Sequence, residues 1–171
     1  MMEFKNWGSL FRVPKTSTEV APHIESRELL YNRIIVQLVK QILRAQGITG
    51  TVVGAENIPV KGGALLVMNH TGYYDFIFGM YGAHLRGRRL VRFMAKKEIF
   101  DVPVVGTLMR MMKHVPVDRE RGAQSIAPTV QALREGKLVG IFPEATISRS
   151  FELKDFKTGA VRISADANAP L

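Results

Sequence analysis

Two short apolar runs constrain the fold more than any other feature of the sequence. Residues 64–68 read ALLVM and residues 138–142 read LVGIF, and neither run alternates with polar side chains. A strand that is apolar at every position is buried on both faces, as in a parallel sheet covered by helices. Helical patterns separate the two runs, which is typical of the α/β class. We therefore predict a mostly parallel sheet flanked by helices.

The pattern of apolar and polar residues also predicts the remaining strands and helices and one domain boundary. Proline and hydroxyl side chains interrupt any period in residues 1–25, so this segment is expected to be irregular. The rest of the chain, residues 26–171, is expected to form one domain. Further strands are predicted at 49–53, 90–95 and 114–117, and helical segments at 26–46, 96–112, 124–135 and 158–167.

Composition narrows the classes of partner and of chemistry. The 171 residues include 24 Lys and Arg against 15 Asp and Glu, a formal net charge of +9. Such a surplus favours anionic partners, namely nucleic acid, anionic lipid or phosphorylated small molecules, although a generically basic protein would share it. The absence of cysteine excludes disulfides, cysteine nucleophiles and thiolate metal sites.

The predicted N-terminal helix, residues 26–46, is amphipathic. Arg33, Lys40 and Arg44 lie at helical spacing on one side, and Ile34, Ile35, Leu38, Ile42 and Ala45 lie on the other. Either the apolar side packs on the protein's own domain, or the helix lies in the interface of an anionic membrane. No run approaches the about 18–20 apolar residues of a membrane-spanning helix. No signal peptide is recognisable at the N-terminus. We expect a cytoplasmic location with peripheral membrane contact.

His70 and Asp75 form the first candidate site. On a regular helix five residues turn the chain by about 500°, which leaves the two side chains about 140° apart. Gly72 lies between them after a predicted strand, so a turn could bring the carboxylate to one imidazole nitrogen. The other nitrogen would then be a free base, and without a serine or cysteine nucleophile it would act on a substrate hydroxyl. A structural histidine near a helix start is the alternative.

Two more polar clusters follow predicted strands. Arg119 and Arg121, after the strand at 114–117, offer forks of donors suited to phosphate, unless they belong to a solvated loop. Glu144 and Thr146 follow the strand at 138–142, where a helix cap or turn is the alternative. Because ligands gather beyond the carboxyl ends of strands in open α/β sheets, the clusters point to one shared site.

Together these residues resemble the motifs of the lysophosphatidate acyltransferase family of glycerolipid acyltransferases. The H-x-x-x-x-D motif matches at His70 and Asp75, and the F-P-E-G-T-R-S motif matches in part at 142–148. An apolar stretch ending in arginine matches at 115–119, and a proline-containing apolar strand would begin at 169–171. The resemblance covers about residues 50–171. Because the chain stops inside the last motif, we expect it to be truncated.

The third motif departs from the family at two positions. Ala145 stands where the family has glycine, and Ile147 stands where it has arginine. Arg149, two positions further on, is the candidate to supply the missing charge. The departures leave the preference for an acceptor head group open.

The resemblance implies a reaction and a set of roles. An acyl group moves from an acyl-CoA or acyl-carrier-protein thioester to the hydroxyl of a lysophospholipid, most simply 1-acylglycerol 3-phosphate. His70 deprotonates that hydroxyl and Asp75 orients His70. The implied substrate-binding residues are Asn69, Arg119, Glu144, Thr146, Arg149 and Lys157. The resemblance implies no metal and no cofactor, an anionic membrane surface as partner, and no nucleic acid.

Other functions stay open at this stage. Glycerol 3-phosphate or a lysophosphoinositide could be the acceptor, and a non-catalytic lipid-binding fragment would share the motifs. A basic nucleic-acid-binding domain would share the charge, but the sequence has no zinc-finger spacing, RNA-recognition signature or helix-turn-helix pattern.

Overall fold

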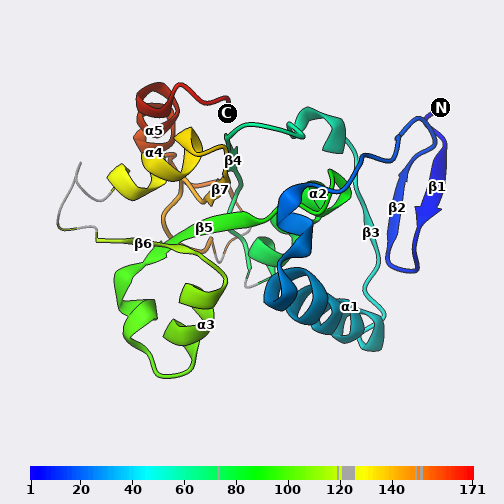
Figure 1. Ribbon diagram of the computed structural model, residues 1–171, viewed down its shortest axis with the longest axis horizontal. Helices are drawn as coiled ribbons and strands as arrows, with labels where there is room; N and C mark the ends of the chain where they lie inside the picture. Colours follow the sequence, from blue (N-terminus) through cyan, green and yellow to red (C-terminus); the bar gives the residue numbers. More distant parts are fainter. Residues whose placement is uncertain (73, 119, 121–125, 149, 151) are drawn as a thin grey trace. The chain divides into compact units, whose positions relative to one another are not determined.

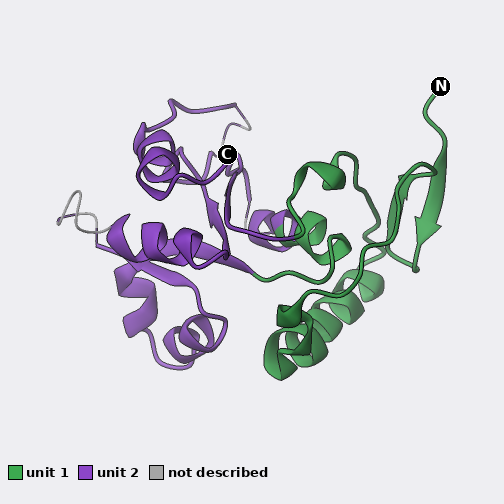
Figure 2. Cartoon of the chain, turned by 45° about the horizontal axis from the view of Figure 1, so that its top comes forward, with its two compact units in different colours: residues 1–60, 80–90 green, residues 61–79, 91–171 purple. Residues whose placement is uncertain are grey.

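The computed structural model describes every residue except 73, 119, 121–125, 149 and 151 (Figure 1). The chain forms two compact units, Met1–Val60 with Met80–Leu90 and Lys61–Gly79 with Val91–Leu171 (Figure 2). This division differs from the predicted boundary after residue 25, because the first unit also takes in a later segment of the chain. Each unit is considered by itself below.

The second unit contains the predicted parallel sheet. Its strands are β4 Ala64–Val67, β5 Val91–Lys96, β6 Val115–Val117 and β7 Leu138–Ile141, in the order β4-β7-β5-β6 with every neighbouring pair parallel. The α/β class and the parallel sheet are therefore confirmed. The two apolar runs are direct neighbours, with Leu65 opposite Val139. Polar residues that follow the two runs consequently leave the same edge of the sheet.

Two helices bury one side of these strands. They are α4 Ala127–Arg134 and α5 Gly159–Ala167, close to the predicted helices at 124–135 and 158–167 (Figure 1). Pro128 lies in the first turn of α4, where its missing N–H has no intrahelical partner to lose. The core cluster between these helices and the sheet consists of Leu65, Val130, Leu133, Val139, Ala160, Ile163 and Ala167. Such burial contributes about 1.5–3 kcal/mol for each large aliphatic side chain.

Short helical pieces connect β5 to β6, as the pattern at 96–112 predicts. They are the 3-10 helix η4 Lys97–Asp101 and the α-helix α3 Val105–Met111. Pro103 lies between them, where the lack of an N–H prevents one continuous helix.

The first unit begins with a hairpin that the sequence reading did not predict. Strands β1 Phe4–Trp7 and β2 Phe11–Pro14 pair antiparallel, and β3 Gly50–Thr51 runs parallel to β2. Gly8, at φ 65°, lies in the connecting turn, where a residue without a side chain is favoured. Phe11 and Val13 are buried and Arg12 is exposed, but Pro14 is buried as well, so burial alternates over only three residues. So short a period carries little signal.

The predicted helix at 26–46 is divided. Its parts are the 3-10 helix η1 Ile24–Arg27, the π-helix η2 Leu29–Ile35 and the α-helix α1 Val36–Ala45. Glu28, at φ −60° and ψ 112°, is extended and separates the first two. A further 3-10 turn, η3 Ala55–Asn57, and helix α2 Asp75–Leu85 complete the elements of this region. Helix α2 begins in the second unit and ends in the first.

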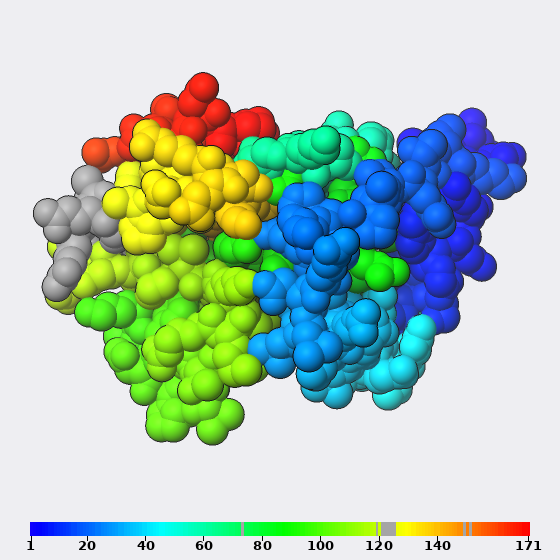
Figure 3. All heavy atoms as spheres, in the orientation of Figure 1, coloured from blue at the N-terminus to red at the C-terminus, as the bar shows by residue number. Residues whose placement is uncertain are grey.

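The segment formed by η2 and α1 has one buried face and one exposed apolar face, with Ile34 in η2 and Leu38 and Ile42 in α1. Val36 and Leu43 are buried, whereas Ile34, Leu38 and Ile42 are 52%, 59% and 44% exposed. In the space-filling view the segment from η2 to α1, drawn in blue to light blue, lies on the visible surface (Figure 3). We call Ile34, Leu38 and Ile42 the apolar ridge. None of the helices in the described ranges combines the length and hydropathy that a membrane span requires.

Candidate active site

His70 and Asp75 meet in a turn at the carboxyl end of β4. Asp75 is the first residue of α2, and its Oδ2 lies 3.0 Å from Nδ1 of His70. The same oxygen accepts the backbone N–H groups of Thr71 at 2.6 Å and Gly72 at 2.8 Å. These three contacts close the loop between strand and helix. The turn through Gly72 that the sequence predicts is therefore present.

The electrostatics of the pair define which nitrogen of His70 is free. Partial burial raises the pKa of Asp75, but the N–H of Gly72, the His70 ring and the N–H of Thr71 outweigh it and hold this pKa below its usual value. The carboxylate is thus ionised at neutral pH and fixes the Nδ1–H tautomer of His70. Nε2 makes no hydrogen bond to any described residue. That nitrogen can accept a proton.

Glu144 joins the loop after β7 to the loop after β4. Its Oε1 accepts the backbone N–H of His70 at 2.7 Å, and its Oε2 accepts the backbone N–H of Lys154 at 3.2 Å. The side chain is only 3% exposed. Ser148 donates its backbone N–H to the carbonyl oxygen of His70 at 2.6 Å. Both backbone polar groups of His70 are therefore held by residues that follow the neighbouring strand.

Phe142 supports the imidazole ring from one side. The rings of His70 and Phe142 are stacked, with centroids 4.1 Å apart and planes inclined by 17°. Phe93 on β5 stacks on Phe142 in turn, at 5.7 Å and 13°. Gly140 leaves room for this stack, because a Cβ there would lie 2.6 Å from the Phe93 ring. Sequence reasoning assigned Phe142 no role, although an aromatic residue directly before Pro143 was visible in the motif.

A second histidine of this region is part of the core. The Nδ1 atom of His114 accepts the backbone N–H of Phe93 at 3.0 Å, and the ring is buried. Burial, followed by the nearby charge of Arg92, lowers the pKa of His114 to about 4. His114 therefore stays neutral and fixes the backbone of β5 under the aromatic stack.

Ala145 adopts a backbone conformation that favours glycine. Its φ is 58°, in the left-handed region, directly after buried Glu144. A Cβ in this region costs about 1–2 kcal/mol relative to glycine. The related motif has glycine at this position, so the structure gives a physical reason for that preference and shows that the turn persists with alanine.

The remaining predicted site residues are distributed as follows. Asn69, Thr146 and Lys157 are exposed near the site's loops, and Lys157 donates its backbone N–H to the carbonyl oxygen of Pro143 at 3.1 Å. Arg119 and Arg149 lie outside the described residues. The structure thus brings together His70, Asp75 and Glu144, and the substrate-binding roles stay predictions. Within the described ranges, no three His, Asp or Glu side chains gather in a way that would hold a metal ion.

The chain is similar to known proteins over most of its length. Residues 50–171 match the acyltransferase family. The chain is 37% identical over 117 residues to the 1-acyl-sn-glycerol-3-phosphate acyltransferase of Bacillus subtilis, covering 68% of this chain and 56% of that protein. It is 30% identical over 129 residues to the enzyme of that name from Borreliella burgdorferi, covering 74% and 50%.

A solved structure shares the fold. The 1-acyl-sn-glycerophosphate acyltransferase PlsC from Thermotoga maritima aligns with a TM-score of 0.53 and 25% identity, covering 68% of this chain and 45% of that one. The chain spans about half the length of the curated relatives it matches. The family match covers most of the chain and includes all three residues that the structure brings together. The chain belongs to the acyltransferase family.

Proposed function

We propose that the protein transfers a fatty acyl group from a thioester to the free hydroxyl of 1-acylglycerol 3-phosphate, which gives phosphatidate. The observation that carries this proposal is the His70–Asp75 pair, joined at 3.0 Å, with Nε2 of His70 left without a partner among described residues. The names of the relatives from Bacillus subtilis and Borreliella burgdorferi supply the substrate class.

The geometry supports transfer in one step without an acyl-enzyme. Nε2 of His70 takes the proton of the acceptor hydroxyl as its oxygen attacks the thioester carbonyl carbon. The Asp75 carboxylate stabilises the imidazolium that forms. The carbon–sulfur bond then breaks, and the imidazolium returns its proton to the departing thiolate. The products are an ester and a free thiol, so the proton count balances.

The acceptor phosphate requires cations near this base. We assign the phosphate to Arg119, with Arg149 and Lys157 as further cations and with Asn69 and Thr146 as hydrogen-bonding neighbours. A guanidinium can hold phosphate through two parallel N–H donors, which a lysine cannot. Glu144 uses both carboxylate oxygens on backbone N–H groups, which favours a positioning role over direct contact with the acceptor.

We also propose the acyl donor and the membrane location of the enzyme. The acyl donor is an acyl-CoA or acyl-carrier-protein thioester, and the enzyme works on the cytoplasmic side of an anionic membrane as a peripheral protein. The apolar ridge of Ile34, Leu38 and Ile42 is exposed, and the basic residues of the same segment lie on its opposite side, as in an amphipathic helix that can lie in a membrane interface.

Substitution of His70, the proposed general base, tests the mechanism directly. The His70→Ala variant should lose acyl transfer by about 10²–10⁴-fold or more, the usual contribution of general-base catalysis. Transfer of labelled acyl groups to 1-acylglycerol 3-phosphate would be measured beside thermal melts. The His23→Ala variant, which changes a half-buried histidine of the first unit, is the matched control and should retain transfer. Wild-type turnover by a folded His70→Ala protein would contradict the mechanism.

The acceptor is tested separately, because glycerol 3-phosphate and lysophosphoinositides are alternative substrates. Each would be offered with the same thioester, and 1-acylglycerol 3-phosphate should give the highest kcat/KM. Arg119→Ala should raise the KM for the acceptor far more than the KM for the thioester, and Arg119→Lys should restore only part of the loss. Equal effects on both substrates would remove Arg119 from the phosphate site.

A further inference from the structure

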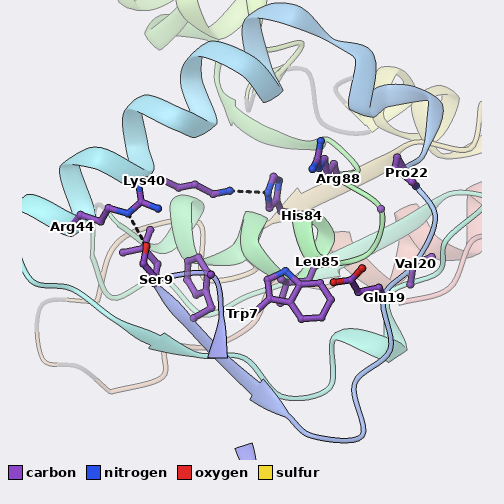
Figure 4. Close-up of a pocket in the computed structure, with 14 residues that line it drawn as sticks. Trp7, Ser9, Glu19, Val20, Pro22, Lys40, Arg44, His84, Leu85 and Arg88 are labelled. Carbon is purple, nitrogen blue, oxygen red and sulfur yellow. Dashed lines mark hydrogen bonds between the residues drawn. The ribbon is translucent and has the colours of Figure 1, made fainter. Parts of the chain in front are cut away.

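The first unit contains a cavity lined by three cations. It has a volume of about 390 Å³ and lies among the β1–β2 hairpin, helix α1 and the end of α2 (Figure 4). Lys40 and Arg44 come from α1, and Arg88 follows α2. Glu19 is the single carboxylate among the lining residues, and it is exposed. The lining therefore carries an excess of positive charge.

His84 is neutral and accepts a hydrogen bond from Lys40. Nζ of Lys40 lies 3.1 Å from Nε2 of His84, as the dashed line in the close-up shows (Figure 4). An ammonium group can only donate, so Nε2 accepts and the imidazole is neutral. Burial, followed by the charges of Lys40 and Arg88, lowers the pKa of His84 to about 4. The lysine head is consequently fixed at the cavity by a neutral ring.

The three cations have no anionic partner within the described chain. Arg44 donates from Nε to the hydroxyl of Ser9 at 2.8 Å, a neutral acceptor. Neither Lys40, Arg44 nor Arg88 forms an ion pair with any described carboxylate. Burial, followed by Arg88 and Arg44, lowers the pKa of Lys40, which shows that the cations act on one another. An anion in the cavity would relieve this repulsion.

The basic surface extends beyond this cavity. A second hollow of about 490 Å³ shares Pro22 and Arg88 with it and is also lined by Arg27 and Arg33. The lining of the first cavity also includes four apolar residues, Trp7, Leu10, Phe11 and Leu85. A ligand that fits both kinds of lining residue has an anionic group and an uncharged body.

We infer that the cavity binds a phosphate group, carried by a phospholipid head or by a soluble phosphate ester. Lys40, Arg44 and Arg88 donate to the phosphate oxygens, and the wall with Trp7 and Phe11 contacts the uncharged part of the ligand. This site belongs to the first unit, whereas His70, Asp75 and Glu144 belong to the second. The inference does not depend on the acyl transfer proposed above.

Trp7 makes the site observable. It is the chain's one tryptophan and it lines the cavity, so a ligand bound there should change its fluorescence. Inorganic phosphate is titrated against chloride at matched ionic strength, and a saturable change with phosphate only is expected. Lys40→Gln and Arg88→Gln should each weaken the apparent affinity about tenfold or more, because each variant loses charge-assisted hydrogen bonds to the phosphate oxygens.

Matched variants separate a site from general attraction. Arg12→Gln removes the same charge from an exposed residue of β2 that does not line the cavity, and it should leave the affinity unchanged. Lys40→Arg keeps the charge and should retain most of the binding, which guards against a folding defect in Lys40→Gln. An equal loss in Arg12→Gln and Lys40→Gln would overturn the inference.

Vesicles distinguish the two sources of phosphate. Phosphatidylcholine vesicles with and without phosphatidate are added to the same set of variants, and Trp7 fluorescence is recorded. A response to phosphatidate that Lys40→Gln and Arg88→Gln both weaken supports a lipid head group. A response to inorganic phosphate without one to phosphatidate supports a soluble ester. No saturable response to either probe would refute the site.

Discussion

The carboxylate of Glu144 holds the backbone of His70 at a distance of 2.7 Å across two neighbouring strand ends. The two residues are separated by 74 positions in the sequence. The second oxygen of Glu144 accepts the N–H of Lys154, so one buried side chain joins three segments. This arrangement fixes the main chain of the proposed base, while Asp75 fixes its ring.

Replacing Glu144 by Gln should lower both stability and turnover. A carboxamide offers one acceptor where two N–H groups now donate, so one buried donor loses its partner at a cost of about 1–3 kcal/mol. We expect a lower Tm and a reduced kcat with little change in the acceptor KM. Thermal melts and steady-state kinetics check this. A raised acceptor KM at unchanged kcat would instead place Glu144 in the acceptor pocket, as the sequence reading proposed.

Replacing Asp75 by Asn should change how the stability of the protein depends on pH. The folded-state pKa of Asp75 is lowered, so its carboxylate stabilises the fold above the ordinary aspartate pKa of about 3.9. That contribution is lost as the pH falls through the lower folded-state value. The stability difference between wild type and Asp75→Asn should therefore be largest near neutral pH and shrink in acid. Urea melts over this range measure it, and a constant difference would contradict it.

Replacing Ala145 by Gly should stabilise the protein. The left-handed conformation at φ 58° costs alanine about 1–2 kcal/mol, which glycine would relieve. Glycine also gives the unfolded chain more conformational entropy, which lowers the free energy of unfolding by about 0.4–1 kcal/mol. A net increase of about 0.5–1 kcal/mol in the free energy of unfolding is expected. Ala165→Gly, on an exposed position inside α5, is the control and should lower stability by a similar amount. Equal losses in both variants would refute the strain.

Charged substitutions in the apolar ridge should weaken membrane binding without unfolding the protein. Ile34 and Leu38 are more than half exposed, so Ile34→Asp and Leu38→Asp bury no unpaired charge. Each should reduce co-sedimentation with anionic vesicles and leave the Tm nearly unchanged.

Leu43→Asp is the matched control for Leu38→Asp, because both residues lie on α1. Its side chain is 1% exposed, so a carboxylate there should lower the Tm strongly. If Leu38→Asp collapses the Tm in the same way and leaves vesicle binding intact, the ridge is a packing surface and membrane attachment lies elsewhere.

The parallel sheet and the contact between His70 and Asp75 could be predicted from the sequence, because both depend on local patterns. Uninterrupted apolar runs at 64–68 and 138–142 can be satisfied only by burial on two faces, and both became parallel strands. The turn between His70 and Asp75 followed from the angular period of a helix and the position of Gly72. Each inference needed no more than a few consecutive residues.

Contacts between residues that are far apart in the sequence could be seen only in the tertiary structure. The bond between Glu144 and His70 exists because β4 and β7 are neighbours in the sheet, and strand order cannot be read from local periods. The cation cavity likewise joins α1 to a hairpin in a segment expected to be irregular. For α1, the period showed two faces, but burial depends on which surface packs against it. Leu43 is buried and Leu38 exposed because the contacts that cover a helix come from elsewhere in the chain.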